Sequence, residues 1–459
     1  MSEPALSSRR ALAVGLVVAV SAFAFDNLAI ATAMPEITRR LGGVALYGAA
    51  FSAFGLAMLL SLAVAGPLAD RFGPRSVLTV GLTLFSVGLV LGGLAPSMGV
   101  VVVARAVQGL GGGTIGACAY VAIGRMWAPD ERGRVLAVLS GAWVLPSLIA
   151  PAIAGVVADQ VSWRLVFLGL IPFPIVAALL VLPALGRLGP AAGATADGSL
   201  WRRARLAVRL AAGTGLVLAA ISLRSLAIAA ALVLLGAVVA VPALHRLLPP
   251  GTLSARPVLP AIVAVRFMLT WSFFGADAFV PFAVTKVRGG DVVLAGLALS
   301  TAGLAWSAAA WVQARPQAPP IRTALLLGFA CIATGTSMVA AVAADDSIPV
   351  GLTFLGWAVA GAGMGFAFNS TSVAALGQAA PGQEGVTTSS LHLAESLGGA
   401  MATGLGGTIV AVGERSGWRL SSTAVAVFVL AMAGTVPGAL AAGRLGAGTD
   451  TLTRPAAAR

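Results

Sequence analysis

Runs of about twenty apolar residues recur along the whole chain, and short polar stretches separate them. An α-helix rises about 1.5 Å per residue, so a run of that length spans the roughly 30 Å of hydrocarbon in a bilayer. The chain is 58% hydrophobic and 10% charged, which is more apolar surface than a water-soluble core can bury. We therefore expect an all-α integral membrane protein.

Fourteen of these runs are predicted to cross the membrane, near residues 11–33, 44–65, 76–95, 99–123, 134–157, 163–183, 207–223, 226–244, 258–282, 292–313, 322–343, 349–376, 386–411 and 420–442. The seventh is the weakest because Arg209 lies within it, so a count of twelve or thirteen stays open. The first is too long for a signal-peptide core and has no clear cleavage site, so we expect it to be retained.

An internal repeat divides the chain into halves. The glycines of GLGGGTIG (Gly109–Gly116) recur in GAGMGFAF (Gly361–Phe368) at an offset of 252 residues, 361 minus 109. An even number of spans separates the copies, so they share one orientation as parallel repeats. The repeat predicts a six-helix bundle at 1–183, a cytoplasmic linker at 184–206, two inserted helices within 207–257, a second six-helix bundle at 258–443 and a tail at 444–459.

The formal net charge of +13 indicates either a nucleic-acid partner or a membrane orientation signal. Most of the 29 basic residues fall on one side of the predicted spans, which is the positive-inside asymmetry. We expect a plasma or inner membrane protein with both termini in the cytoplasm, facing anionic lipid and binding no nucleic acid. Two distant cysteines and two histidines predict no disulfide, metal or cofactor, and we expect a monomer.

The ten residues GPLADRFGPR, from Gly66 to Arg75, interrupt the apolar pattern between the second and third spans. They resemble the signature loop of the major facilitator superfamily, although Pro74 stands where that loop usually carries a basic residue. A proline lacks an N–H, which costs nothing in the first turn of a helix, so Gly73-Pro74 can begin the third span. The matching positions are Gly66, Leu68, Ala69, Asp70, Arg71, Gly73 and Arg75.

Three further stretches resemble the fourteen-span drug:proton antiporters of the same superfamily. RAVQG (Arg105–Gly109) is similar to their arginine motif, and FDNLAIATAMPEI (Phe25–Ile37) is similar to their first-span motif. The fifth-span antiporter motif is partly present, because Pro151 and Gly155 are kept while Pro146 and two alanines replace its glycines. The resemblance covers essentially the whole chain. It implies two six-helix bundles with two additional helices between them.

The same resemblance implies that the signature loop is a conformational gate. Asp70 is then expected to meet the second bundle near the start of span thirteen, about Gly382–Val386, where a helix N-terminus attracts an acid. A loop that only anchors the topology is the alternative. The expected gate residues are Gly66, Asp70, Arg71, Gly73, Arg75, Glu131 and Arg132.

Charged residues inside the membrane are costly, so each needs a partner or a function. Asp26 in span one and Arg105 in span four lie at similar predicted depth, and we expect them to pair. An acid poised between an arginine and a desolvating environment can exchange a proton, and a static structural ion pair is the alternative.

The second half offers its own titratable residues. Arg266 and Asp277 are eleven residues apart on one helix, so they share a face about 16 Å apart and are expected to line one polar cavity. His392 and Glu395 have i, i+3 spacing and form a candidate proton site, with a helix-packing hydrogen bond as the alternative. Proton coupling is assigned to Asp26, Arg105, Asp277, His392 and Glu395.

Amides and aromatic side chains with few charges suit an amphipathic ligand. The same aromatic side chains are equally typical of interface anchors. The predicted substrate cavity is lined by Asn27, Gln108, Trp143, Arg266, Trp271, Phe274 and Asn369.

These features favour a secondary active transporter that exports hydrophobic or amphipathic drugs by proton antiport and alternating access. Proton-coupled uptake or facilitated diffusion of a small metabolite is the alternative within transport, and a non-transporting scaffold or sensor is the alternative outside it. The glycine runs lack the Lys-Ser/Thr of a phosphate-binding loop, and no nucleophile–base constellation is present. We therefore expect neither an enzyme nor an ATP-driven pump.

Overall fold

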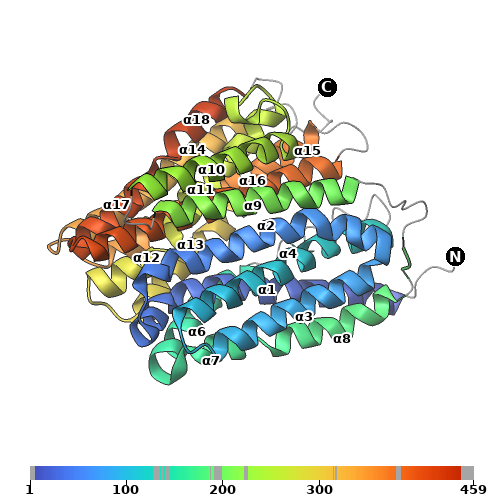
Figure 1. Ribbon diagram of the computed structural model, residues 1–459, viewed down its shortest axis with the longest axis horizontal. Coiled ribbons are helices and arrows are strands. Elements are labelled where there is room, and N and C mark those ends of the chain that lie inside the picture. Colours follow the sequence, from blue (N-terminus) through green and yellow to red (C-terminus); the bar gives the residue numbers. More distant parts are fainter. Residues whose placement is uncertain are drawn as a thin grey trace.

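The computed structural model describes residues 6–127, 135, 138–139, 142, 144–186, 188–190, 199–221, 226–313, 315, 318–378 and 384–445. Every regular element in this part of the chain is helical, and the long helices run roughly along one axis (Figure 1). The predicted all-α architecture is confirmed for these residues.

The helices of the first half pack on one another. Among the pairs in contact are α1 with α6 and α8, α2 with α4, and α3 with α4 and α8. Their bounds are α1 Leu6–Leu41, η1 Val44–Leu46, α2 Tyr47–Phe72, α3 Pro74–Gly93, α4 Met98–Met126, α6 Val144–Val157, the π-helical η2 Ala158–Ser162, α7 Arg164–Leu168 and α8 Pro172–Leu185.

The helices of the second half form a second group, in which α11 packs on α16, α13 and α14 pack on α15, and α14 packs on α17. Two helices, α9 Ser199–Ile221 and α10 Leu226–Leu247, connect the groups. The remaining bounds are η3 Thr252–Ser254, α11 Leu259–Asp277, α12 Val280–Phe282, the π-helical η4 Ala283–Val287, α13 Val292–Gln313, α14 Ile321–Ala344, α15 Leu352–Gly377, α16 Glu384–Arg415, α17 Leu420–Met432 and α18 Thr435–Gly443.

Within the described residues, 12 helical segments are long and apolar enough to cross a membrane. Two of the fourteen predicted spans are not among them. The described part of 134–157 contributes only a short apolar helix, Ile149–Ser162, and α9 carries four arginines in its first eleven residues. The described part of this membrane protein is therefore all-helical with twelve candidate spans, and fourteen crossings remain a prediction.

Two predicted spans are interrupted by proline. Helix α7 ends at Leu168 and α8 begins at Pro172, because Pro172 has no N–H to donate to the carbonyl of Leu168. Helix α11 ends at Asp277 for the same reason, since Pro281 lies four residues further on.

The expected linker at 184–206 is helical at both of its ends. Helix α8 continues to Leu185, and α9 begins at Ser199, well before the predicted start at 207. The reason is amphipathic packing. Leu206, Ala207 and Leu210 bury one side of α9, while Arg202, Arg205 and Arg209 occupy the exposed side.

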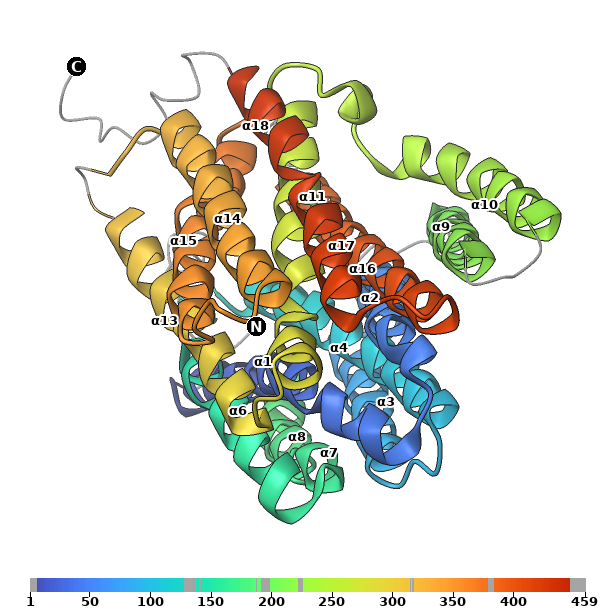
Figure 2. The same ribbon diagram turned by 90° about the vertical axis from the view of Figure 1, so that its left-hand side faces the viewer.

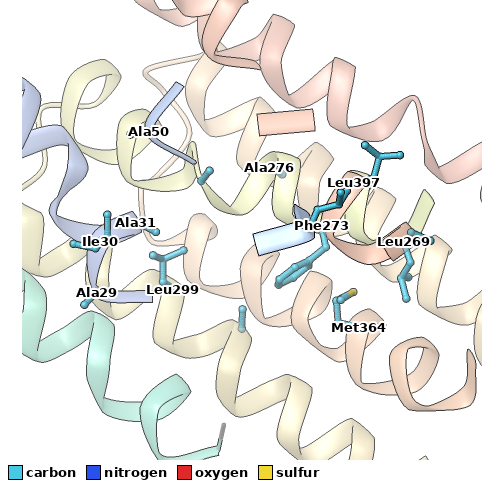
Figure 3. Close-up of a cluster of buried hydrophobic side chains, with 14 of the residues drawn as sticks. Ala29, Ile30, Ala31, Ala50, Leu269, Phe273, Ala276, Leu299, Met364 and Leu397 are labelled. Atoms are coloured by element: carbon cyan, nitrogen blue, oxygen red, sulfur yellow. The ribbon is translucent and has the colours of Figure 1, made fainter. Parts of the chain in front are cut away.

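Two seams join the halves, one between α2 and α16 and the other between α6 and α13. A single cluster of buried apolar side chains continues across them. Figure 3 shows part of this cluster, with Ala50 of α2 and Ile30 of α1 from the first half and Phe273 and Leu397 from the second. The two halves therefore share one hydrophobic core.

We call the membrane face near Leu6 and Leu445 the terminal face and the one near Gly43 and Gly417 the opposite face. The seams are closest toward the opposite face. A Cβ at Gly48 of α2 would lie 2.6 Å from the carbonyl oxygen of Thr403 of α16, so only a glycine allows this approach.

Helices α9 and α10 form an antiparallel hairpin outside both bundles. Among the described helices only α9 makes extensive contact with α10, and α9 also contacts α2 and α16. Figure 2 shows the hairpin at the side of the molecule, with α9 facing the bundles. The hairpin is thus held at the α2–α16 seam by one of its two helices.

Candidate functional site

A closed polar network lies inside the first bundle. Nη1 of Arg105 on α4 donates to Oδ2 of Asp26 on α1 at 2.5 Å and to Oε1 of Gln108 at 3.1 Å. Nε2 of Gln108 donates to the second carboxylate oxygen of Asp26 at 2.9 Å. All three side chains are fully buried. The predicted pairing of Asp26 with Arg105 is confirmed, and Gln108 belongs to this triad.

The triad offsets much of the cost of burying two charges. Both oxygens of Asp26 accept a hydrogen bond, and the Arg105 guanidinium carbon lies 4.1 Å from the ring centroid of Phe54 on α2, a cation–π contact. Nε of Arg105 is buried with no hydrogen-bond partner among the described residues. Neutralising Asp26 would therefore leave a buried cation without its counter-charge. This change would weaken the packing of α1, α2 and α4 around Arg105.

A second polar cluster lies in the other bundle, around Arg266 of α11. Its Nη2 donates to Oγ of Ser372 on α15, and its guanidinium carbon lies 3.7 Å from the ring centroid of Phe368. Oε2 of Glu395 on α16 is 3.9 Å from Nη1 of Arg266 and 3.4 Å from Nδ1 of His392. The predicted proximity of His392 and Glu395 is confirmed, and Arg266 joins them from another helix.

Accessibility differs within this second cluster. The Arg266 side chain is 2% exposed, while those of Glu395 and His392 are 22% and 32% exposed. Tyr120 of α4 lies beside His392, with ring centroids 5.7 Å apart, so the cluster touches the first bundle. Glu395 and His392 are therefore the more accessible members of this cluster.

Asp277 lies in a different environment from Arg266. Its Oδ1 accepts a hydrogen bond of 3.0 Å from Nε1 of Trp357 on α15. Ring contacts lead from Trp357 through Phe273 and Trp306 to Phe368, with centroids 5.1 to 5.6 Å apart. This column of four aromatic side chains thus separates Asp277 from Arg266. The structure identifies no cavity shared by both charges within the described residues, so the single polar cavity stays a prediction.

The other predicted cavity residues are scattered. Nδ2 of Asn27 donates to the carbonyl of Phe23 one turn earlier at 3.5 Å, and Nε1 of Trp271 donates to the carbonyl of Leu430 on α17 at 3.0 Å. Trp271 therefore connects α11 to α17 through this hydrogen bond. Asn369 is exposed, Phe274 is half-buried beside Phe273, and Trp143 lies outside the described residues.

The signature loop closes on its own bundle. Nη2 of Arg125, at the end of α4, donates to Oδ1 of Asp70 at 2.6 Å, and Nη1 donates to the carbonyl of Gly189 at 3.0 Å. Gly73 has φ +83°, which strongly favours glycine, and α3 begins at Pro74 as predicted. The partner that Asp70 contacts is Arg125, which was not among the predicted gate residues. Residues 382–383, Glu131 and Arg132 lie outside the described residues.

The remaining gate residues lie around the signature loop, and the antiporter-motif residues lie on α6. Arg71 stacks on its neighbour Phe72, and Arg75 lines a cavity of about 450 Å³ with Gly73, Ser76, Thr79, Gly186 and Leu188. Nothing lies within 4 Å of a Cβ built at Gly66. Pro146, Pro151 and Gly155 are buried on α6, and a Cβ at Gly155 would lie 2.8 Å from the carbonyl oxygen of Val292. The antiporter motif therefore packs at the α6–α13 seam.

Tyr47 closes the opposite face. Its hydroxyl donates to the carbonyl of Ala278 at 2.8 Å, and its ring lies 5.3 Å from Phe279 and 6.0 Å from Phe282 between centroids. Tyr47 and Tyr120 were not among the predicted site residues, although they are the chain's two tyrosines. Their scarcity in an apolar chain was a usable signal, because a buried phenol needs a hydrogen-bond partner.

Comparison with known families gives a match over most of the chain. The family model described as Major Facilitator Superfamily matches residues 14–403. That stretch includes the triad, the signature loop, the α9–α10 hairpin and the Arg266 cluster.

Most of these curated relatives match this chain over only part of their own length. The chain is similar to the multidrug transporter protein MdtP of Bacillus subtilis, at 32% identity over 39% of this chain and 34% of that protein. It is 36% identical to the Acurin A biosynthesis cluster MFS-type transporter of Aspergillus aculeatus, over 34% of this chain and 28% of the relative. The matches thus span about a third of these relatives. The MFS-type transporter ppz2 of Metarhizium majus matches over 86% of this chain and 70% of its own length, at 25% identity.

Solved structures share the fold. A POT family transporter in complex with a thioalcohol-conjugated peptide superposes with a TM-score of 0.68 at 14% identity, over 94% of this chain and 95% of the other. A POT family transporter in complex with 5-aminolevulinic acid gives 0.67 at 13% identity over the same shares. At such low identity, the likeness concerns the arrangement of helices only.

Proposed function

The chain belongs to the Major Facilitator Superfamily, whose members are membrane transporters of small molecules and not enzymes, and we propose that it exports hydrophobic or amphipathic compounds in exchange for protons. The observation that carries the proposal is the buried Asp26–Arg105–Gln108 triad. Several partial relatives are named as multidrug transporters or efflux pumps, which supports export.

In this proposal Asp26 is a proton-binding group. Protonation of its carboxylate removes the counter-charge of Arg105 and weakens both hydrogen bonds to Asp26. Arg105 also stacks on Phe54 of α2, and α2 packs on α16. A movement of Arg105 would therefore change the packing at the α2–α16 seam. The triad therefore offers a physical link between proton binding and the relative position of the bundles.

The Arg266 cluster is proposed as the substrate-facing group of the second bundle. Glu395 and His392 are partly accessible, and Phe368 and Trp306 supply aromatic surface next to them. A few polar groups beside aromatic walls suit amphipathic ligands. Asp277 at the far end of the aromatic column is proposed as a further proton site.

The proposed transport cycle is alternating access of the two bundles. The close approach of Gly48 to Thr403 and the Tyr47–Ala278 bond support a state closed at the opposite face. The basic surplus supports a cytoplasmic terminal face in the cell membrane. We further propose that α6 and α9 cross the membrane with the twelve candidate spans, and that the monomer is the transporting unit.

Drug-driven proton movement in everted membrane vesicles tests this function. An interior acidified by respiration should become more alkaline when a substrate is added outside, because the antiporter carries substrate in and protons out. Asp26→Asn should abolish this signal. Asp346→Asn makes the same isosteric change at an exposed carboxylate and should leave it intact.

The sign of the response separates the alternatives. A proton symporter would acidify the interior on substrate entry, and facilitated diffusion would move no protons. Undiminished alkalinisation by the Asp26→Asn protein would remove Asp26 from the coupling mechanism. Absence of any substrate-driven flux or efflux phenotype would favour the scaffold alternative.

A further inference from the structure

The two helices inserted between the bundles belong to the most one-sidedly charged part of the chain. From Ser199 to Ala276 the sequence contains no acidic residue and eight arginines. Four of these arginines lie in the first eleven residues of α9, and Arg246 lies in the last turn of α10. This charge has no counter-charge on its own segment.

Glycine contacts set the register of the hairpin. A Cβ at Gly213 of α9 would lie 2.6 Å from the carbonyl oxygen of Gly236 and 2.7 Å from the amide nitrogen of Ala240, both on α10. In an antiparallel pair with this register, Arg205 is level with Arg246 to within a turn. The basic ends of both helices therefore lie at one height, at the terminal face.

Four arginines of this end are exposed. Arg202, Arg205 and Arg209 follow one another at spacings of three and four, so they share the exposed side of α9. Arg246 is exposed as well, and among the described residues no ion pair involves any of these four. Trp201, which is 66% exposed, stands beside them and is typical of the membrane–water interface.

Apolar surface continues from this basic end toward the opposite face. Leu234, Val238 and Val241 of α10 are 67%, 63% and 43% exposed. Arg209 lies about one turn deeper than Arg205, so its flexible side chain can extend back to the headgroup level. A cationic patch above an apolar helix face is complementary to a molecule with an anionic head and hydrocarbon chains.

We propose that the terminal-face end of the α9–α10 hairpin binds the phosphate headgroup of an anionic glycerophospholipid. Arg205, Arg209 and Arg246 hold the phosphate, and the acyl chains run along the exposed face of α10. This inference rests on the proposed membrane placement of the hairpin but not on drug export.

The site gives the inserted helices a role. Among the described helices, α9 makes the extensive contacts of the hairpin with the bundles, where a Cβ at Gly215 would lie 3.9 Å from Leu56 of α2 and Leu218 packs against Gly404 of α16. These are the two helices of one inter-bundle seam. A lipid bound across α9 and α10 holds the hairpin as one unit against that seam.

Native mass spectrometry of the full chain released from nanodiscs tests the proposal. The nanodiscs contain phosphatidylglycerol and phosphatidylcholine in equal parts, and retained lipids are counted after mild activation. The wild-type protein should keep phosphatidylglycerol in preference to phosphatidylcholine, and Arg205→Gln/Arg246→Gln should lower that retention at least ten-fold. The matched control, Arg256→Gln/Arg315→Gln, removes two exposed arginines of the same face outside the hairpin and should behave as wild type.

Two further measurements distinguish a built site from general surface attraction. Millimolar glycerol 3-phosphate should not displace the lipid, because it lacks acyl chains. Hydrogen exchange of α9 and α10 should slow in phosphatidylglycerol for wild type and for Arg246→Lys, but not for Arg205→Gln/Arg246→Gln. Equal lipid loss in the control, or unchanged retention in the hairpin variant, would overturn the proposal. Neither readout uses substrate or a proton gradient, so a failure of the export proposal leaves this test intact.

Discussion

Replacing Tyr47 with phenylalanine should loosen the opposite face selectively. The substitution keeps the ring packed against Phe279 and Phe282 and removes only the hydroxyl that donates to the carbonyl of Ala278 at 2.8 Å. Tyr47 is fully buried, so water does not replace this bond in the closed state. Once the bundles part, water can hydrogen-bond the phenol, and the two proteins then differ little.

The magnitude follows from the net value of one hydrogen bond, about 0.5 to 1.5 kcal/mol. With RT near 0.6 kcal/mol, the ratio of open to closed molecules should rise about 2- to 13-fold, with a central value of about 5-fold. Tyr47→Ala should have a larger effect, because it also removes the aromatic contacts and leaves a cavity.

Distances between spin labels at the opposite face measure that ratio. Leu46 and Leu420 are both exposed there, one in each half, and labels can be placed on them after Cys118 and Cys331 are replaced. The long-distance population should increase in Tyr47→Phe. Tyr120→Phe is the matched control, because the Tyr120 side chain is 43% exposed and lies in the part of α4 nearer the terminal face. An unchanged distribution in Tyr47→Phe, or an equal change in Tyr120→Phe, would refute the reasoning.

Three other substitutions test the seam, the loop and the second cluster. Gly48→Val places a branched side chain against the carbonyl of Thr403, so it should hold the opposite face open in the same label measurement and abolish transport. Asp70→Asn weakens a surface pair in which the Asp70 side chain is 53% exposed, so the free energy of unfolding should change by less than about 1 kcal/mol, while the transport rate falls if the loop is a gate. Glu395→Gln removes the carboxylate near Arg266. It should destabilise the protein by less than the about 3–5 kcal/mol typical of a fully buried pair, because Glu395 is 22% exposed, and it should reduce substrate-driven proton flux; unchanged melting and flux would contradict its role.

Some side-chain contacts could be predicted from the sequence, and others could not. The Asp26–Arg105 pair was predictable, because two opposite charges at similar depth in hydrocarbon have few other partners. The contact between Asp70 and Arg125 was not, since the family resemblance directed Asp70 toward the second bundle. The Arg266–Glu395 contact was missed for a related reason. Its members lie on helices α11 and α16, which are far apart in sequence, and apolar periodicity says nothing about which helices become neighbours.

The sequence by itself determined that the chain is helical and lies in a membrane, because apolar runs in lipid must satisfy their backbone hydrogen bonds internally. It also determined the repeat, the start of α3 at Pro74 and the identity of the costly intramembrane charges. Only the tertiary structure decided which charges meet, where Tyr47 and Tyr120 bridge the halves, and that α9 rests on the α2–α16 seam. Helix formation depends on neighbouring residues along the chain. Helix packing depends on side-chain shape across distances in sequence that no local pattern records.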